Sequence, residues 1–128
     1  MNKMTDRTLD EVLQSTSDCI YPEQLGEARV SVDSTDADGD TALHILIWRG
    51  DTDGALLLIE KGAPINAVGD MGETPLHVAI SRQDMTVIDA LLKAGAKTDM
   101  ASEFGETAQQ KAAKQGIRLP RPKGDLLL

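Results

Sequence analysis

The chain has 128 residues, a length that predicts one domain. Its 21 acidic residues against 13 Lys plus Arg give a formal net charge of −8, which argues against nucleic acid or an anionic membrane as the partner. Only Tyr21, Trp48 and Phe104 are aromatic, so the core must be built from aliphatic side chains and alanine, which suits closely stacked helices. Because a single cysteine, Cys19, allows no internal disulfide and no apolar run has the length of a signal peptide or a membrane span, we expect a cytoplasmic protein.

The first expected element is a short helix that begins after Thr8. Thr8 and Glu11 have the spacing of a capping box, in which each side chain satisfies a backbone N–H group of the other residue. Three apolar residues fall on one face of this helix: Leu9, Val12 and Leu13. The Tyr21-Pro22 step then interrupts the chain, and we expect residues 1–35 to shield the next unit from solvent.

The middle of the chain contains two copies of a 33-residue unit. Several pairs of identical residues lie 33 positions apart: Gly39 with Gly72, Thr41 with Thr74, Leu43 with Leu76, His44 with His77, Gly62 with Gly95 and Ala63 with Ala96. Each unit reads as an acidic turn with glycine, a short apolar helix, a break, a second apolar helix and a Gly-Ala step. A period of this length is typical of repeat proteins, whose units bury their apolar faces by stacking on their neighbours.

The segments Gly39-Asp40-Thr41-Ala42-Leu43-His44 and Gly72-Glu73-Thr74-Pro75-Leu76-His77 resemble the ankyrin repeat. The resemblance covers about residues 36–116, with a fainter copy before them, between Thr8 and Asp33. It implies an all-α solenoid of stacked antiparallel helix pairs with projecting turn fingers. The expected units are a degenerate N-terminal capping repeat over residues 1–35, repeats over 36–68 and 69–101, and a truncated C-terminal capping repeat over 102–116.

The ends of the predicted helices follow from residue type. Thr41 and Thr74 suit N-cap positions, and Gly62 and Gly95 suit the left-handed residue that ends a second helix. The third unit has polar Gln109 and Gln110 in place of the Leu-His pair, as expected of a terminal repeat whose outer face meets water. Prolines at 120 and 122 exclude a normal second helix, so residues 117–128 are expected to form a basic, irregular or mobile tail.

Catalytic and metal-binding interpretations fit poorly. One repeat of translation should separate His44 and His77 by about 10 Å, too far to share a zinc ion, and the resemblance gives both a structural role in hydrogen bonds within and between repeats. The run from Asp36 to Asp40 begins like a calcium loop, but Thr41 and Ile47 stand where an EF-hand needs Gly and Glu. Because no phosphate-binding or nucleophile motif is present either, we expect no enzyme, no cofactor and no metal.

The resemblance assigns a concave binding surface to the fingers and the exposed ends of the first helices. The fingers, residues 36–40, 70–73 and 103–106, carry seven acidic residues and no basic one: Asp36, Asp38, Asp40, Asp70, Glu73, Glu103 and Glu106. Neighbouring like charges do not stabilise the fold but would attract a basic partner. The alternative is an acidic rim that only aids solubility.

Large apolar groups are expected on the same surface. By resemblance, Trp48, Met71 and Phe104 occupy exposed places that face a ligand, although Trp48 could instead fold over the neighbouring helix and Phe104 could pack under the terminal repeat. The predicted partner-binding residues are Asp38, Asp40, Trp48, Arg49, Asp70, Met71, Glu73, Ser81, Arg82, Glu103, Phe104 and Glu106.

These features favour a protein-protein interaction module that is monomeric when unbound and holds a partner with a basic surface. One specific form of this hypothesis is an inhibitor, such as an immunity protein that covers the basic cleft of a nuclease-like toxin. A regulatory adaptor or a structural scaffold without a fixed ligand is the alternative, and a metal-binding protein fits the sequence less well.

Overall fold

Six α-helices form the part of the chain that the computed structural model describes, residues 8–16, 20 and 30–119. They are α1 (Leu9–Gln14), α3 (Ala42–Arg49), α4 (Thr52–Glu60), α5 (Pro75–Arg82), α6 (Met85–Lys93) and α7 (Ala108–Lys114). The 3-10 turn η2 (Asp70–Gly72) lies between α4 and α5. Within the same ranges β-type pairing is limited to two isolated β-bridges, Thr35 with Thr41 and Ala101 with Thr107. The expected all-α class is therefore confirmed.

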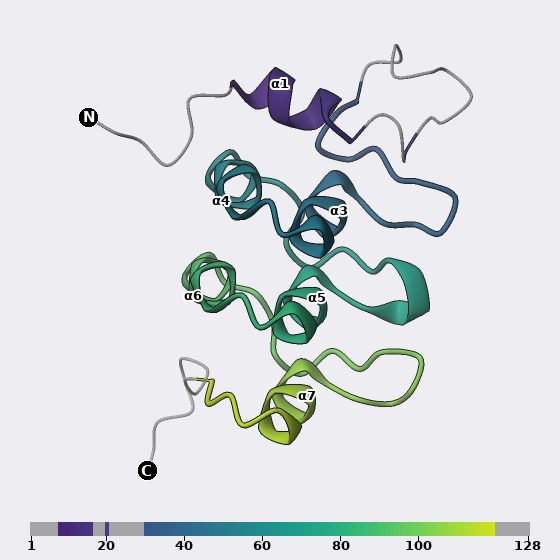
Figure 1. Cartoon of the computed structure of the whole chain (residues 1–128). Coiled ribbons are helices and arrows are strands. Elements are labelled where there is room, and N and C mark those ends of the chain that lie inside the picture. Colours follow the sequence, from purple (N-terminus) through teal and green to yellow (C-terminus); the bar gives the residue numbers. More distant parts are fainter. Residues whose placement is uncertain (1–7, 17–19, 21–29, 120–128) are drawn as a thin grey trace.

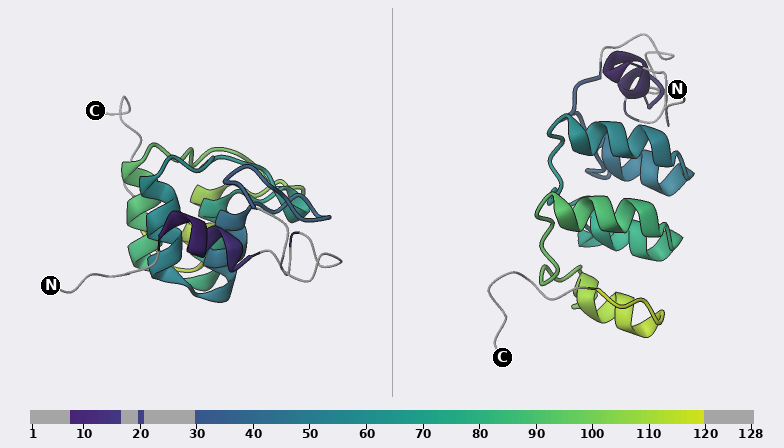
Figure 2. Two further views of the ribbon diagram at one scale, coloured as in Figure 1. Left: turned by 90° about the horizontal axis from the view of Figure 1, so that it is seen from above. Right: turned by 90° about the vertical axis from the view of Figure 1, so that its left-hand side faces the viewer.

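The helices form two rows (Figures 1 and 2). Helices α3, α5 and α7 stack in one row, and α4 and α6 stack beside them as the second helices of antiparallel pairs. Loops before α3, α5 and α7 project from the first row on the side away from α4 and α6 (Figure 1). This arrangement confirms the predicted solenoid of helix pairs with projecting fingers.

Each helix of the first row begins at a threonine. Thr41, Thr74 and Thr107 are N-caps of α3, α5 and α7, and each hydroxyl accepts a hydrogen bond from the backbone N–H three residues later. The breaks that follow α3 and α5 both have left-handed backbone, at Gly50 with φ 81° and at Gln83 with φ 57°. The predicted caps and break positions are therefore confirmed, although the second break is made without glycine.

The core is aliphatic and lies between stacked repeats. The largest side chains that are almost fully buried include Leu43, Leu46, Ile47, Leu58, Leu76, Ile80 and Leu91. All of them belong to the predicted apolar helix faces. Three further apolar residues of the second helices, Leu57, Ile59 and Leu92, are only partly buried and pack against this cluster.

The two ends of the stack differ from the full repeats. The predicted capping box at Thr8 and Glu11 is present, and α1 buries Val12 and Leu13, whereas the Tyr21-Pro22 step lies outside the described residues. At the other end Gln109 and Gln110 are exposed, as expected. Part of the expected tail is packed, because Ile117 and Leu119 lie partly buried against the core, and residues 120–128 lie outside the description. No helix in the described ranges is long and apolar enough to cross a membrane.

Candidate protein-binding face

Three fingers of similar construction project from the stack. In each finger, a backbone N–H donates to the carbonyl four residues later at 2.9 Å, from Asp36 to Asp40, from Gly69 to Glu73 and from Ser102 to Glu106. These bonds close the fingers at the positions expected from the sequence. We call the three fingers and the adjoining side of α3, α5 and α7 the finger face; it corresponds to the predicted concave surface.

The fingers are joined to one another. The Oδ1 atom of Asp40 accepts a hydrogen bond from the backbone N–H of Asp70 at 2.9 Å, which connects the first finger to the second. The carbonyl of Met71 accepts from the N–H of Glu103 at 3.0 Å, which connects the second finger to the third. Met71 has φ 59°, a left-handed value that is uncommon for a residue other than glycine. The finger face is therefore one connected surface rather than three independent loops.

Two buried histidines fix the bases of the second and third fingers. Nδ1 of His44 accepts from the N–H of Thr41 at 3.1 Å, so its proton is on Nε2, which donates to the carbonyl of Glu73 at 3.0 Å. His77 repeats this arrangement with Thr74 and with the carbonyl of Glu106. The structural role predicted for both histidines is confirmed by these contacts within and between repeats.

Burial shifts the pKa values of His44 and of its neighbour Asp40. Burial lowers the pKa of His44, because the charged imidazole loses its hydration. Burial also raises the pKa of Asp40, while the hydrogen bond from Asp70 acts in the opposite direction. No group of three His, Cys, Asp or Glu side chains within the described ranges is arranged to hold a metal ion.

The fingers carry no basic residue of their own, but their negative charge is partly neutralised by two lysines of α7. Lys111 of α7 pairs with Glu73 at 2.9 Å, with both side chains largely buried, and Lys114 pairs with Glu106 at 2.7 Å. The hydrogen bond from Lys114 lowers the pKa of Glu106. Three acidic residues of the fingers remain exposed: Asp38, Asp70 and Glu103. Two of the twelve predicted binding residues, Glu73 and Glu106, thus hold α7 against the fingers.

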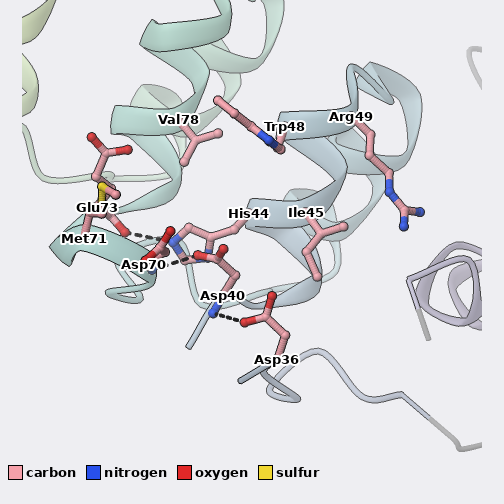
Figure 3. A pocket seen from close by; sticks show the side chains of 10 residues that line it. All are labelled: Asp36, Asp40, His44, Ile45, Trp48, Arg49, Asp70, Met71, Glu73 and Val78. Atoms are coloured by element: carbon pink, nitrogen blue, oxygen red, sulfur yellow. Dashed lines mark hydrogen bonds between the residues drawn. The ribbon is translucent and has the colours of Figure 1, made fainter. Parts of the chain in front are cut away.

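A groove of about 380 Å³ opens between the first two fingers and helices α3 and α5 (Figure 3). Its apolar wall consists of Ile45, Trp48, Met71 and Val78. Carboxylates lie at the finger end of the groove: Asp36, Asp40, Asp70 and Glu73. The groove therefore combines an apolar surface with negative charge at one end.

The predicted aromatic anchors are exposed. Trp48 is 59% exposed, Met71 50% and Phe104 72%, so neither ring is buried in the core and Phe104 does not pack under the terminal repeat. The alternative for Trp48 holds in part, because its ring lies against Arg82 of α5, the neighbouring helix. The guanidinium of Arg82 lies over the Trp48 ring, 5.3 Å from its centroid. This contact joins α5 to α3 at the edge of the finger face.

Two other predicted binding residues have structural surroundings. The Nη1 atom of Arg49 donates to the carbonyl of Ser15 at 2.9 Å and so holds the C-terminal end of α1, where a cation also complements the helix dipole. In Figure 3 the Arg49 side chain extends away from the other groove residues. Ser81 is half-buried in α5 and is not among the groove residues.

Comparison with known families gives one decisive match. The family of ankyrin repeats matches residues 14–102 in three copies, which is well over half of the chain. The chain belongs to the ankyrin-repeat family. A search of curated proteins finds no match. Ankyrin repeats are protein-protein interaction modules and typically not enzymes.

Two groove residues of this ankyrin-repeat protein were missed by sequence reasoning. Ile45 and Val78 line the groove beside Trp48 but were assigned to neither the core nor the binding surface. They lie 33 residues apart and so occupy the same place in successive repeats. An apolar residue that recurs beside the core stripe, one repeat apart, was the signal that could have identified them.

Proposed function

We propose that this ankyrin-repeat protein binds a protein partner with a basic surface through the finger face. The observation that carries the proposal is the groove itself, which is lined by the exposed indole of Trp48 and the exposed Met71 side chain and has the exposed carboxylate of Asp70 at its finger end. Large apolar groups within a polar and charged rim are typical anchors of protein interfaces. Trp48 alone offers an area whose burial is favourable at about 25 cal/mol per Å².

The exposed carboxylates of the fingers add long-range attraction. The chain carries a net charge of −8, and Asp38, Asp70 and Glu103 concentrate exposed negative charge on one side of the stack. Such a field accelerates association with a basic partner and weakens with added salt. The same net charge favours a monomer in the absence of a partner, because copies of the chain repel one another. We also propose a cytoplasmic location, which the single cysteine suits.

One partner class with the required chemistry is the basic cleft of a nuclease-like toxin, which the protein would inhibit by covering it. A small acidic protein with a preformed face suits this role because little ordering is needed on binding. A regulatory adaptor that binds a basic segment of another protein would use the same residues. The identity of the captured partner separates these two possibilities.

The test is capture of a partner at low salt from the cell of origin, followed by mass spectrometry. We expect a basic protein to co-purify, to be lost with the variants Trp48→Ala and Asp70→Asn, and to dissociate as salt is raised. Asp89→Asn is the matched control, since Asp89 is an exposed aspartate on α6, in the other row of helices. A partner that binds all of these variants equally, or that is insensitive to salt, would refute the proposal.

A further inference from the structure

We propose that the groove between the first two fingers binds an extended segment of the partner in which a lysine or arginine and a large apolar residue stand two positions apart. This inference rests on the proposed function and specifies the partner's chemistry at one place on the finger face. It is drawn from three features of the groove: the carboxylates at one end, the indole at the other and the distance between them.

The finger end of the groove suits a cation. Asp70 is exposed there, and its backbone is fixed because its N–H donates to Asp40 at 2.9 Å. The carboxylate of Asp36 lies at the same end, where its Oδ1 accepts from two N–H groups of its own finger. Glu73 is already paired with Lys111, so Asp70 is the carboxylate best placed for an incoming ammonium or guanidinium group.

The helix end of the groove suits an apolar side chain and not a second cation. Trp48 supplies most of the exposed apolar surface there, and the largely buried Ile45 and Val78, 7% and 8% exposed, form the floor beside it. A cation could in principle stack on the indole, but the guanidinium of Arg82 already lies 5.3 Å from the ring centroid. Because like charges repel, a partner cation at this end would be disfavoured, whereas an aliphatic side chain would bury apolar surface against the wall.

The distance between the two ends determines the spacing in the partner. The buried ring of His44 contacts the base of the second finger, and His44 and Trp48 are four residues apart on α3, so the finger base and Trp48 are separated by about 6 Å along the helix axis. A lysine or arginine side chain placed at the finger base extends outward along the finger, the direction in which Asp70 is exposed. Alternate side chains of an extended strand point to the same side and lie about 6.6 Å apart. A cation and an apolar residue two positions apart therefore reach both ends together, whereas adjacent residues point to opposite sides.

The test compares the binding of three peptides of identical composition to the full chain. One contains Lys-Ala-Leu and another Lys-Leu-Ala, each flanked by Gly-Ser and Ser-Gly and blocked at both ends, and a Leu-Ala-Lys peptide tests the opposite direction. Binding is followed by the fluorescence of Trp48, the only tryptophan of the chain. We expect the better of the two peptides with the two-position spacing to bind about tenfold more tightly than Lys-Leu-Ala. Equal affinities, or no saturable change at millimolar peptide, would overturn the inference.

Variants connect the two ends of the groove to the two peptide residues. Asp70→Asn should weaken binding of the better peptide several-fold, while Asp89→Asn on α6 should leave it unchanged. A Lys-Ala-Lys peptide should bind poorly to the native chain and gain affinity with Arg82→Gln, but not with the exposed control Arg118→Gln. A Lys-Ala-Lys peptide that already binds the native chain as well as Lys-Ala-Leu would contradict the role given to Arg82.

The outcome is separable from that of the proposed function. If a basic protein is captured through Trp48 and Asp70 while the peptides show no preference for spacing, the groove binds a partner but does not read this pattern. If no basic protein is captured and the peptides nevertheless discriminate, the groove chemistry stands and the proposed partner class is wrong.

Discussion

The contact between the first two fingers depends on a glycine at position 69. A Cβ atom added to Gly69 would overlap Oδ1 of Asp40 and lie 3.0 Å from Nε2 of His44. Gly69 has φ −112°, so the requirement is for space and not for a left-handed backbone. Gly69→Ala should therefore force apart the two groups that attach the second finger to the first repeat.

The size of the effect can be worked out from the bonds involved. The added methyl group displaces Asp40, which accepts from Asp70, and disturbs His44, which donates to Glu73 at 3.0 Å. We assign each bond about 1.5 kcal/mol, because one acceptor is ionised and the other bond is largely buried. Alanine also restricts the unfolded chain, which offsets about 0.4–1 kcal/mol. The expected net loss is about 2 kcal/mol, or a Tm lower by about 8 °C.

Urea unfolding followed by circular dichroism measures this loss, and a double-mutant cycle with Asp40→Ala tests its cause. Removing the Asp40 carboxylate provides room for the methyl group, so Gly69→Ala should cost about 1 kcal/mol less in that background. If the two losses simply add, the overlap with Asp40 is not the reason for glycine at this position, and the reasoning fails.

Three further predictions concern the exposed rings, the buried histidine and the lysine pairs. Trp48→Ala and Phe104→Ala should change the Tm by no more than about 2 °C, whereas Leu43→Ala in the core should cost about 2–5 kcal/mol; a large loss for either ring would show that it supports the fold. The pKa of His44 is lowered in the folded chain, so the contribution of the neutral imidazole to stability is complete above the unfolded pKa of 6.5 and is lost as the pH falls below that value. The free energy of unfolding should therefore decrease between about pH 7.5 and about pH 5.5. His44→Gln, which imitates Gln110 of the third repeat, should reduce that slope, and an unchanged slope would assign it to other groups. Lys111→Ala should cost about 1 kcal/mol in urea unfolding because it leaves the largely buried Glu73 unpaired, while Lys93→Ala, whose pair with Asp89 is exposed, should be nearly neutral; equal losses would contradict the difference in burial.

The repeat period predicted most of the fold because the same residues perform the same backbone task in each unit. Thr41 and Thr74 were recognisable as caps from their residue type and their place in the repeat, and the histidines from the motif that surrounds them. Less could be predicted at the stack ends, where the pattern fades. Ile117 and Leu119 pack against the core although they follow the last helix, where no periodic pattern predicts their burial.

The candidate site was predicted in outline but not in its charge distribution. Exposure of Trp48 and Phe104 followed from their places in the repeat. The pairing of Glu73 with Lys111 joins residues 38 positions apart, one repeat plus five, so it appears only when helices are stacked at their real distance. Which carboxylates remain exposed on the fingers depends on whether a lysine side chain of another element can reach them, and the place of a residue within its own repeat does not reveal this.

The bonds made by the histidines also give the stack a direction. The Nε2 atom of each ring donates forward, from His44 to the second finger and from His77 to the third, so every histidine requires a following unit with a carbonyl in the right place. Gln110 closes its own capping box but has no imidazole to extend toward a later unit. Lengthening the solenoid by copying residues 69–101 in place would preserve each of these connections, whereas extension beyond α7 would first require a histidine at position 110.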